Sequence, residues 1–325
     1  TTLFRSRNDW SSTLPKDNYS YFYPSASLSW IFSETLNRAG VNVGPLSFGK
    51  IRGSWAKVGN DTDPYRLTNT YNLKYNIKDG TMGVTRDDWR ANPNLKNETV
   101  RSYEAGLELR AWNDRIGLDV SWYKTNAFDQ ILKVAIPPAT GYKYDLINAG
   151  NIQNTGWEIV LNATPIKSLK FSWDTNINWA TNKNKVIELR KGLTSQDLSL
   201  GALPINIVAE VGGSYGDIYG TAYLRDDKGN KIIGADGIPV MDTERKKLGN
   251  ALPKGTLGWS NTLNYKNWYF SFLIDMSYGG DIFMGSINMG TNSGTLAMTS
   301  PYREGGLIIE GVNQSDGKSN TTAIT

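Results

Sequence analysis

The sequence predicts an all-β chain whose antiparallel strands form a β-barrel that crosses a membrane. The stretch LKFSWDTNINWA, residues 169–180, alternates apolar and polar side chains, which gives an extended strand one apolar and one polar face. Only 39% of the residues are hydrophobic, yet there are 17 Tyr and 11 Trp, a composition that suits strands with one face toward lipid. Alternating segments also come in pairs, with a short turn at one end and a long connection at the other.

The alternating segments begin with residues 25–32 and 48–57 and continue as three hairpins. We expect the hairpins at 100–111 with 115–126, 156–164 with 169–181, and 255–265 with 268–282. In a membrane barrel the apolar side chains of each strand meet lipid, and Trp and Tyr near the strand ends anchor the interface. The residues predicted to lie on this lipid-facing side are Trp30, Trp55, Leu107, Trp122, Phe171, Trp173, Ile177, Trp179, Trp268, Phe270, Phe272 and Ile274.

Three long connections, about 56–99, 127–155 and 182–254, carry most of the Pro, Asn, Asp and Gly residues. Short turns are periplasmic and long loops are extracellular in outer-membrane barrels, so we expect these connections to be extracellular. Within the third, Arg225–Val240 predicts a small hairpin with a turn at Asp227–Asn230. Residues 184–192 fit either a short helical turn or a continuation of the preceding strand.

Composition excludes several classes of function. The chain has no Cys and no His, which removes disulfides, thiol and imidazole catalysis, and Cys or His metal sites. Lys and Arg are scattered among acidic residues, with a formal net charge of +4, and no basic run indicates nucleic-acid binding. No stretch reaches the roughly 20 apolar residues of a membrane-spanning helix. We therefore predict no metal, no cofactor and no enzymatic activity.

Glu104, Glu108 and Asp119 form the one carboxylate group that could suggest hydrolysis. A glycosidase pair needs a substrate cleft and one carboxyl with a raised pKa. A polar lumen wall, in which these carboxylates pair with cations such as Arg110, explains the same residues without catalysis. We favour the lumen wall because the alternation already accounts for the polarity of this face.

Aromatic side chains in the predicted loops are the candidates for ligand contact. They stand beside Asp, Asn and Arg, and such aromatic faces stack on sugar rings or grip peptides. The alternative is that they pack the long loops against each other or against a partner. The candidates are Trp89, Tyr142, Tyr144, Tyr215 and Tyr219.

Several phrases in order resemble the SusC/RagA family of TonB-dependent outer-membrane transporters from Bacteroidetes. The strongest is NAGNIQNTGWEIVLNATPIKSLKFSWDTNINWATNKNKVIEL at 148–189, and the run beginning VGGSYGDIYGTAYL at 211–283 is equally close. NPNLKNETVRSYEAGLEL at 92–109, FYPSASLSWIFSE at 22–34 and REGGLIIEGV at 303–312 also fit. The resemblance covers nearly the whole chain.

The resemblance implies that residues 1–325 form part of the C-terminal half of a 22-strand barrel, with the plug domain and the TonB-contacting box outside this chain. It also implies localisation in the outer membrane of a Bacteroidetes-like envelope. Its expected partners are a SusD-like surface lipoprotein and TonB. The expected function is TonB-dependent import of oligosaccharides, with import of oligopeptides by the same mechanism as the alternative.

Two other classes stay open at this point. A passive porin or adhesin barrel would have the same strands without coupling to TonB. A soluble β-sandwich lectin would bury residues such as Phe270 and Phe272 in a core instead of exposing them to lipid.

Overall fold

The computed structural model of the chain describes residues 1–75, 80–198 and 204–324. The chain divides into two compact units. The first comprises Thr1–Gln196, Glu210–Tyr215 and Pro253–Gly279, and the second comprises Asp197–Ala209, Gly216–Leu252 and Gly280–Thr325. Of the residues predicted to contact ligand or lipid, only Tyr219 belongs to the second unit.

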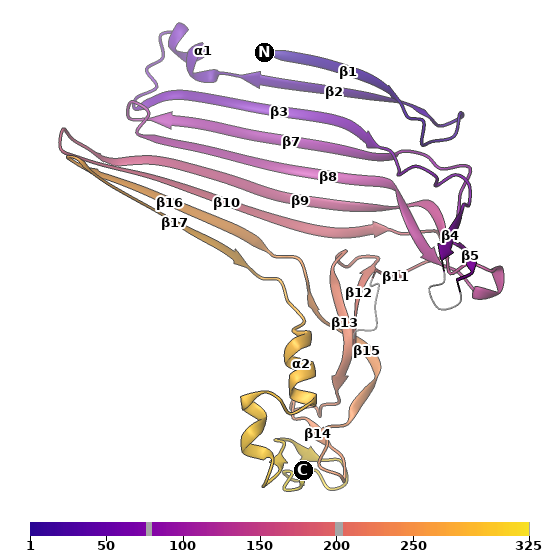
Figure 1. The fold of residues 1–325 in the computed structure, drawn as a ribbon. Coiled ribbons are helices and arrows are strands. Elements are labelled where there is room, and N and C mark those ends of the chain that lie inside the picture. The colour runs from indigo at the N-terminus through magenta and orange to yellow at the C-terminus, as the bar shows by residue number, and fades with distance from the viewer. Residues whose placement is uncertain (76–79, 199–203, 325) are drawn as a thin grey trace. The chain divides into compact units, whose positions relative to one another are not determined.

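A ten-stranded sheet forms the first unit, and along its main path each strand is antiparallel to its neighbours (Figure 1). The remaining strand, β6 (Trp89–Arg90), pairs with β9 in parallel. This arrangement confirms the predicted all-β antiparallel fold. In spatial order the main path is β1 (Thr2–Trp10), β2 (Ser20–Trp30), β3 (Leu46–Asn60), β7 (Glu98–Ala111), β8 (Ile116–Ala135), β9 (Tyr144–Lys167), β10 (Phe171–Glu188), β16 (Gly255–Tyr265) and β17 (Trp268–Tyr278).

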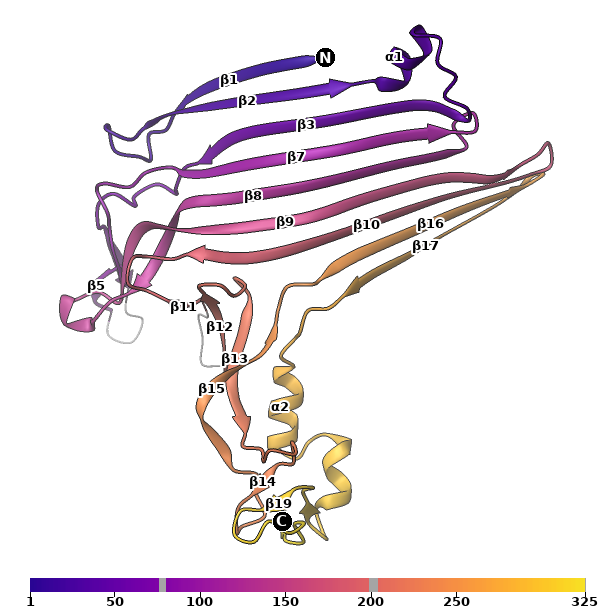
Figure 2. The ribbon, with the colours of Figure 1, turned by 180° about the vertical axis from the view of Figure 1, so that it is seen from behind.

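The three predicted hairpins are confirmed, and their short turns lie at one end of the sheet together with α1 (Phe32–Arg38), as Figure 2 shows from behind. We call this the turn end. The β7–β8 turn is made by three consecutive residues with left-handed φ angles, from Trp112 to Asp114. Helix α1 is tied to β3 by Ser33, whose Oγ accepts the Gly49 N–H at 3.0 Å. The opposite end, where the longer connections start, is the loop end.

The long connections contain more strand than the sequence predicted. Strands β8 and β9 stay paired as far as Ala135 and Tyr144, so the predicted connection 127–155 is wrong in its bounds and reduces to residues 136–143, including the short 3-10 helix η1 (Pro138–Thr140). Residues 184–188 continue β10, which decides between the two structures left open for 184–192. In the first connection, β4 (Tyr71–Tyr75) and β5 (Met82–Arg86) form a hairpin before β6.

Register partners in an antiparallel sheet point to the same face, so the pairing decides which side chains lie together. We call the apolar side of the sheet the outer face and the opposite side the inner face. The pairing places all twelve predicted lipid-facing side chains on the outer face. One row across it is apolar from end to end: Trp30, Ile51, Leu107, Val120, Ile159, Trp179, Leu257 and Met276.

Apolar side chains of the outer face stay exposed even on central strands. Tyr103 is 50% exposed, Trp157 is 48% exposed and Phe270 on the edge strand is 60% exposed. A soluble β-sandwich would bury these residues against a second layer. This exposure contradicts the soluble-lectin alternative and agrees with a wall whose outer face needs an apolar environment.

The main buried cluster of the first unit lies under the connections at the loop end. Leu14, Trp89, Leu95 and Leu146 form the main cluster, with Tyr144 packed against it. This cluster brings the β1–β2 connection, β6 and the start of β9 together. The long connections at the loop end therefore form a packed structure.

The second unit has little helix and several short strands. The predicted hairpin at Arg225–Val240 is confirmed by the bridge between Arg225 and Lys231 and by the Asp226 N–H to Asn230 O bond of 3.0 Å. Neither α-helix in the described part of the chain has the length and hydropathy that a membrane-spanning helix requires. The remaining elements are β11 (Ser195–Asp197), β12 (Ile205–Glu210), β13 (Asp217–Tyr223), β14 (Ile232–Ile233), β15 (Met241–Asn250), α2 (Gly285–Asn292), η2 (Ala297–Tyr302), β18 (Leu307–Ile308), β19 (Val312–Asn313) and β20 (Ala323–Ile324).

Candidate functional site: the inner face and the loop cluster

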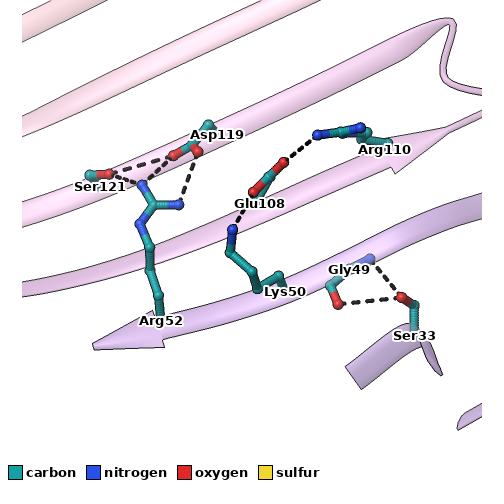
Figure 3. Close-up of polar contacts among 8 residues, drawn as sticks. All are labelled: Ser33, Gly49, Lys50, Arg52, Glu108, Arg110, Asp119 and Ser121. Carbon is teal, nitrogen blue, oxygen red and sulfur yellow. Dashed lines mark hydrogen bonds and ion pairs between the residues drawn. The ribbon is translucent and has the colours of Figure 1, made fainter. Parts of the chain in front are cut away.

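Several charged side chains of the inner face form ion pairs between strands. Arg52 on β3 binds Asp119 on β8 through two bonds, Nη1 to Oδ2 at 2.9 Å and Nη2 to Oδ1 at 2.6 Å (Figure 3). Its Nη2 also donates to Ser121 Oγ at 2.5 Å. A bidentate guanidinium–carboxylate pair is directional as well as strong, so it fixes both side chains on the wall.

A glycine between the two strands makes this bridge possible. Arg52 and Asp119 are not neighbours in the sheet, because β7 lies between β3 and β8. At the crossing point β7 carries Gly106, the register partner of both Arg52 and Ser121. A Cβ atom there would lie 2.6 Å from Nε and Cζ of Arg52, far inside van der Waals contact. The absence of a side chain at residue 106 opens the path for the guanidinium.

Glu108 is held by cations at both carboxylate oxygens. Oε2 lies 2.7 Å from Lys50 Nζ, and Oε1 lies 2.8 Å from Arg110 Nη2. With Asp119 bound by Arg52, two of the three carboxylates that suggested hydrolysis are neutralised by fixed partners. This geometry matches the predicted polar wall, in which the carboxylates serve as ion-pair partners.

Neutral amides line the inner face of β9 and β10. Asn182 and Asn184 both donate their Nδ2 to Asn154 Oδ1 at 3.0 Å. Tyr123 reaches from β8 across Gly156 to Asn182 Oδ1 at 3.3 Å, and Gly156 leaves room for this ring as Gly106 does for Arg52. A depression of about 280 Å³ nearer the turn end continues the polar surface; its lining includes Asn162, Asp174, Asn176, Ser260 and Thr262.

The structure brings Trp89, Tyr142 and Tyr144 together in one loop cluster. Trp89 is 8% exposed and packs in the buried core with Tyr144 beside it. The Arg66 guanidinium carbon lies 4.7 Å from the centroid of the Trp89 ring, and Lys133 Nζ lies 5.6 Å from it. Cations over the face of the indole ring stabilise the ring in this buried position. Ligand contact by these residues stays a prediction, and Trp89 has little surface to offer in this conformation.

Asn69 is a residue of the loop cluster that sequence reasoning missed. Its Nδ2 donates to the Trp89 carbonyl at 2.9 Å, and its Oδ1 accepts the Ala91 N–H at 3.1 Å. The Tyr142 hydroxyl donates to the same Oδ1 at 3.4 Å, and the Arg86 guanidinium carbon lies 4.1 Å from the Tyr142 ring centroid. An isolated Asn in a polar loop gives no sequence signal for this role, because its partners come from distant segments.

Tyr215 and Tyr219 are not members of the loop cluster. Tyr215 is half-buried, its N–H donates to Asn184 Oδ1 at 2.8 Å, and burial together with the nearby Glu98 carboxylate raises the pKa of its hydroxyl. Tyr219 lies on β13 in the second unit, where its register partners are Asn206 and Lys247. The five predicted ligand contacts therefore do not form a single site within one unit.

In the described part of the chain no three Cys, His, Asp or Glu side chains come close enough to hold a metal ion. The site is thus a polar wall with packed loops at one end.

A family profile described as "TonB dependent receptor-like, beta-barrel" matches residues 4–303. The chain belongs to this family.

Known TonB-dependent receptors share both sequence and fold with the chain. TonB-dependent receptor P26 of Formosa agariphila is 31% identical over 304 residues, which are 85% of this chain and 30% of the relative. TonB-dependent receptor SusC of Bacteroides thetaiotaomicron is 27% identical over 321 residues, which are 91% of this chain and 31% of the relative. The chain thus spans about a third of the length of these receptors, and the resemblance to the SusC/RagA family is confirmed.

A solved structure with the same fold is the RagAB peptide importer in its closed-closed state. Its TM-score is 0.71 at 21% identity, over 86% of this chain and 32% of that chain. The likeness at this level of identity concerns the fold. It agrees with the reading of the ten-stranded sheet as a stretch of a TonB-dependent receptor barrel.

Proposed function

We propose that the chain forms part of the barrel wall and loops of an outer-membrane importer of the SusC/RagA type. One observation carries the proposal: the strand pairing collects the apolar side chains on one face and the ion pairs and amides on the other. A sheet with these two faces suits a barrel in lipid with a polar lumen. The twelve outer-face residues would then contact lipid, and the loop end would be extracellular.

The inner face would guide the ligand and perform no chemistry on it. Several of its charges are already paired, as in Arg52 with Asp119 and Glu108 with Lys50, so these groups are held on the wall. Energy for import would come from TonB acting on a plug inside the complete barrel. A SusD-like lipoprotein would close over the loops, which carry the candidate ligand contacts.

We propose oligosaccharides as the imported class. The amides of Asn154, Asn182 and Asn184 present neutral donors and acceptors along the wall, which suits uncharged, hydroxyl-rich chains. Oligopeptides are the second candidate, because backbone amides would use the same groups and because RagAB, whose fold the chain shares, is described as a peptide importer.

Uptake by cells carrying the full-length protein tests the proposal. A deletion strain complemented with this protein is given fluorescent oligosaccharides and oligopeptides of matched length, with and without a protonophore. We expect oligosaccharide uptake that the protonophore abolishes. Selective uptake of peptides would reverse the choice of substrate, uptake insensitive to the protonophore would indicate a passive pore, and new reducing ends in the medium would indicate a hydrolase.

A further inference from the structure

The outer face changes character toward the loop end, strand by strand. On β3 the outward series Ile51, Gly53 and Trp55 is followed by Lys57. On β7 the same series ends in Tyr103 and then Arg101, and on β8 it ends in Trp122 and then Lys124. On β10 it passes Trp179 and Thr181 before Lys183 and Lys185. We call the five cations, Lys57, Arg101, Lys124, Lys183 and Lys185, the cationic belt.

The five belt residues are neighbours in the sheet. One register row runs Trp55, Tyr103, Lys124, Thr155, Lys183, and the next row toward the loop end runs Lys57, Arg101, Asn126, Gln153, Lys185. These two rows hold five cations and no carboxylate. The first acidic side chains, Asp129 and Glu188, come further toward the loop end, where they line a depression of about 340 Å³ together with Arg101.

No ion pair among the described residues engages the belt, in contrast to the inner face, where Arg52 and Lys50 are paired. The side chains of Arg101, Lys183 and Lys185 are exposed. The Arg101 guanidinium rests 4.9 Å from the Phe128 ring centroid, which leaves its N–H groups available. The belt therefore presents positive charge that no ion pair neutralises, most directly at Lys183 and Lys185.

The turn end of the outer face has no comparable cluster of charges; one cation lies against it, Lys266, whose Nζ is 5.4 Å from the Tyr265 ring centroid. Its outward residues are apolar or aromatic, among them Ile116, Phe171, Tyr265 and Trp268. Clustered cations on adjacent strands thus lie at only one of the two borders of the apolar band. A barrel that merely needed polar residues at both borders would show no such asymmetry.

Strand geometry places the belt just beyond the apolar band. From Phe171 to Lys183 a strand rises about 41 Å at about 3.4 Å per residue, and about 29 Å along the membrane normal at a tilt of about 45°. The apolar band of such barrels is about 25 Å tall. On β3, β7 and β8 the outward residue immediately before the cation is aromatic, as expected at a membrane interface.

We propose that the cationic belt binds the phosphate groups of anionic lipids in the outer leaflet that surrounds the barrel. The inference rests on the proposed function, because the loop end must be extracellular for the belt to meet that leaflet. The charge complementarity is direct: the belt offers Lys and Arg donors, and phosphate oxygens accept charge-assisted hydrogen bonds from them. Long aliphatic stems let these side chains pack on the adjacent aromatics while their charged ends reach the head groups.

Binding of lipid A to the full-length protein in detergent tests the proposal. The probes are phosphorylated lipid A and the same lipid after enzymatic removal of its phosphates. The belt variant is K124Q/K183Q/K185Q, and the matched control is K16Q/K74Q/K228Q, which removes three exposed loop charges. Each basic residue near an anionic surface changes binding by roughly fivefold, so we expect binding of phosphorylated lipid A to weaken by about 100-fold in the belt variant.

The control variant should stay within about twofold of the wild type, and a K124R/K183R/K185R variant should retain binding. Dephosphorylated lipid A should bind wild type and belt variant equally. The proposal is overturned if the belt variant binds phosphorylated lipid A as tightly as the wild type. It is also overturned if free inorganic phosphate at millimolar concentration displaces the lipid, or if the belt variant loses a copurifying lipoprotein while its lipid binding is unchanged.

Heat-modifiable gel mobility of each variant checks that the barrel is folded.

Uptake by cells separates this proposal from the proposed function. The belt variant should still reach the outer membrane and import ligand, because the belt lies on the face away from the lumen. Normal uptake with unchanged lipid binding would refute only the belt, whereas a wild-type protein that imports nothing would refute the proposed function.

Discussion

Replacing Gly106 by Ala should destabilise the protein, although Ala ordinarily strengthens a strand. The new Cβ would lie 2.6 Å from Nε and Cζ of Arg52, so the flexible side chain must leave its path over β7. The bidentate pair with Asp119 and the bond to Ser121 are then lost. Because Arg52 and Asp119 are 27% and 32% exposed, solvent screening limits the loss to about 1–2 kcal/mol.

The sign of this effect should reverse when Arg52 is first shortened to Ala. In the R52A background the three atoms nearest to the new Cβ are removed, and replacing a strand glycine gains about 0.5–1 kcal/mol of conformational entropy. The two backgrounds should thus differ by about 2 kcal/mol in the effect of G106A. Chemical unfolding of the full-length protein in lipid, followed by Trp fluorescence, measures all four members of the cycle.

Gly258 provides the matched control. It also lies on the inner face of a central strand, and no heavy atom lies within 4 Å of the position of its missing Cβ. G258A should therefore be neutral or slightly stabilising. An equal cost of G106A with and without Arg52 would refute the reasoning, since the glycine would then matter for some reason other than the bridge.

Three further predictions concern the outer face, the loop cluster and a turn. F272R should cost about 2–4 kcal/mol in lipid, whereas S271R on the inner face of the same strand should cost less than about 1 kcal/mol in the same unfolding assay. N69A removes two bonds that hold β6, so amide exchange of residues 88–91 should quicken while the strands of the main sheet stay protected. The pKa of Asp226 is lowered by donors from the Asn230 side chain and backbone. Its contribution to the turn should therefore be present at neutral pH and lost as pH falls through that lowered pKa, which amide protection of residues 226–230 would report and D226N should make independent of pH.

The alternating pattern predicted which face of a strand each side chain occupies, but it did not predict where every strand ends. The alternation in residues 169–180 gave the two faces of β10 correctly, because side chains of any extended strand point to opposite sides. The bounds of the connection 127–155 were wrong, since β8 and β9 stay paired as far as Ala135 and Tyr144, through residues such as Ile131, Leu132 and Val134 that do not alternate apolar with polar side chains. Backbone pairing leaves no signature in side-chain polarity.

The loop cluster could not have been predicted in detail. Trp89 in RDDWR looked like an exposed ligand contact, yet it is buried by Leu14, Leu95 and Leu146 from other segments. Asn69 holds it through bonds to the backbone of residues 20 and 22 positions further along the chain. Such partners are set by loop packing, which no local pattern encodes.

By itself the sequence determined the strand class, the two faces of each strand, the absence of Cys and His chemistry, and membership of the receptor family, since each of these depends on residue types or local order. Only the tertiary structure decided that Arg52 meets Asp119, 67 positions away, across the gap at Gly106. It also gathered Lys57, Arg101, Lys124, Lys183 and Lys185 into one belt. The physical reason is register, because the pairing of strands distant in sequence decides which side chains become neighbours.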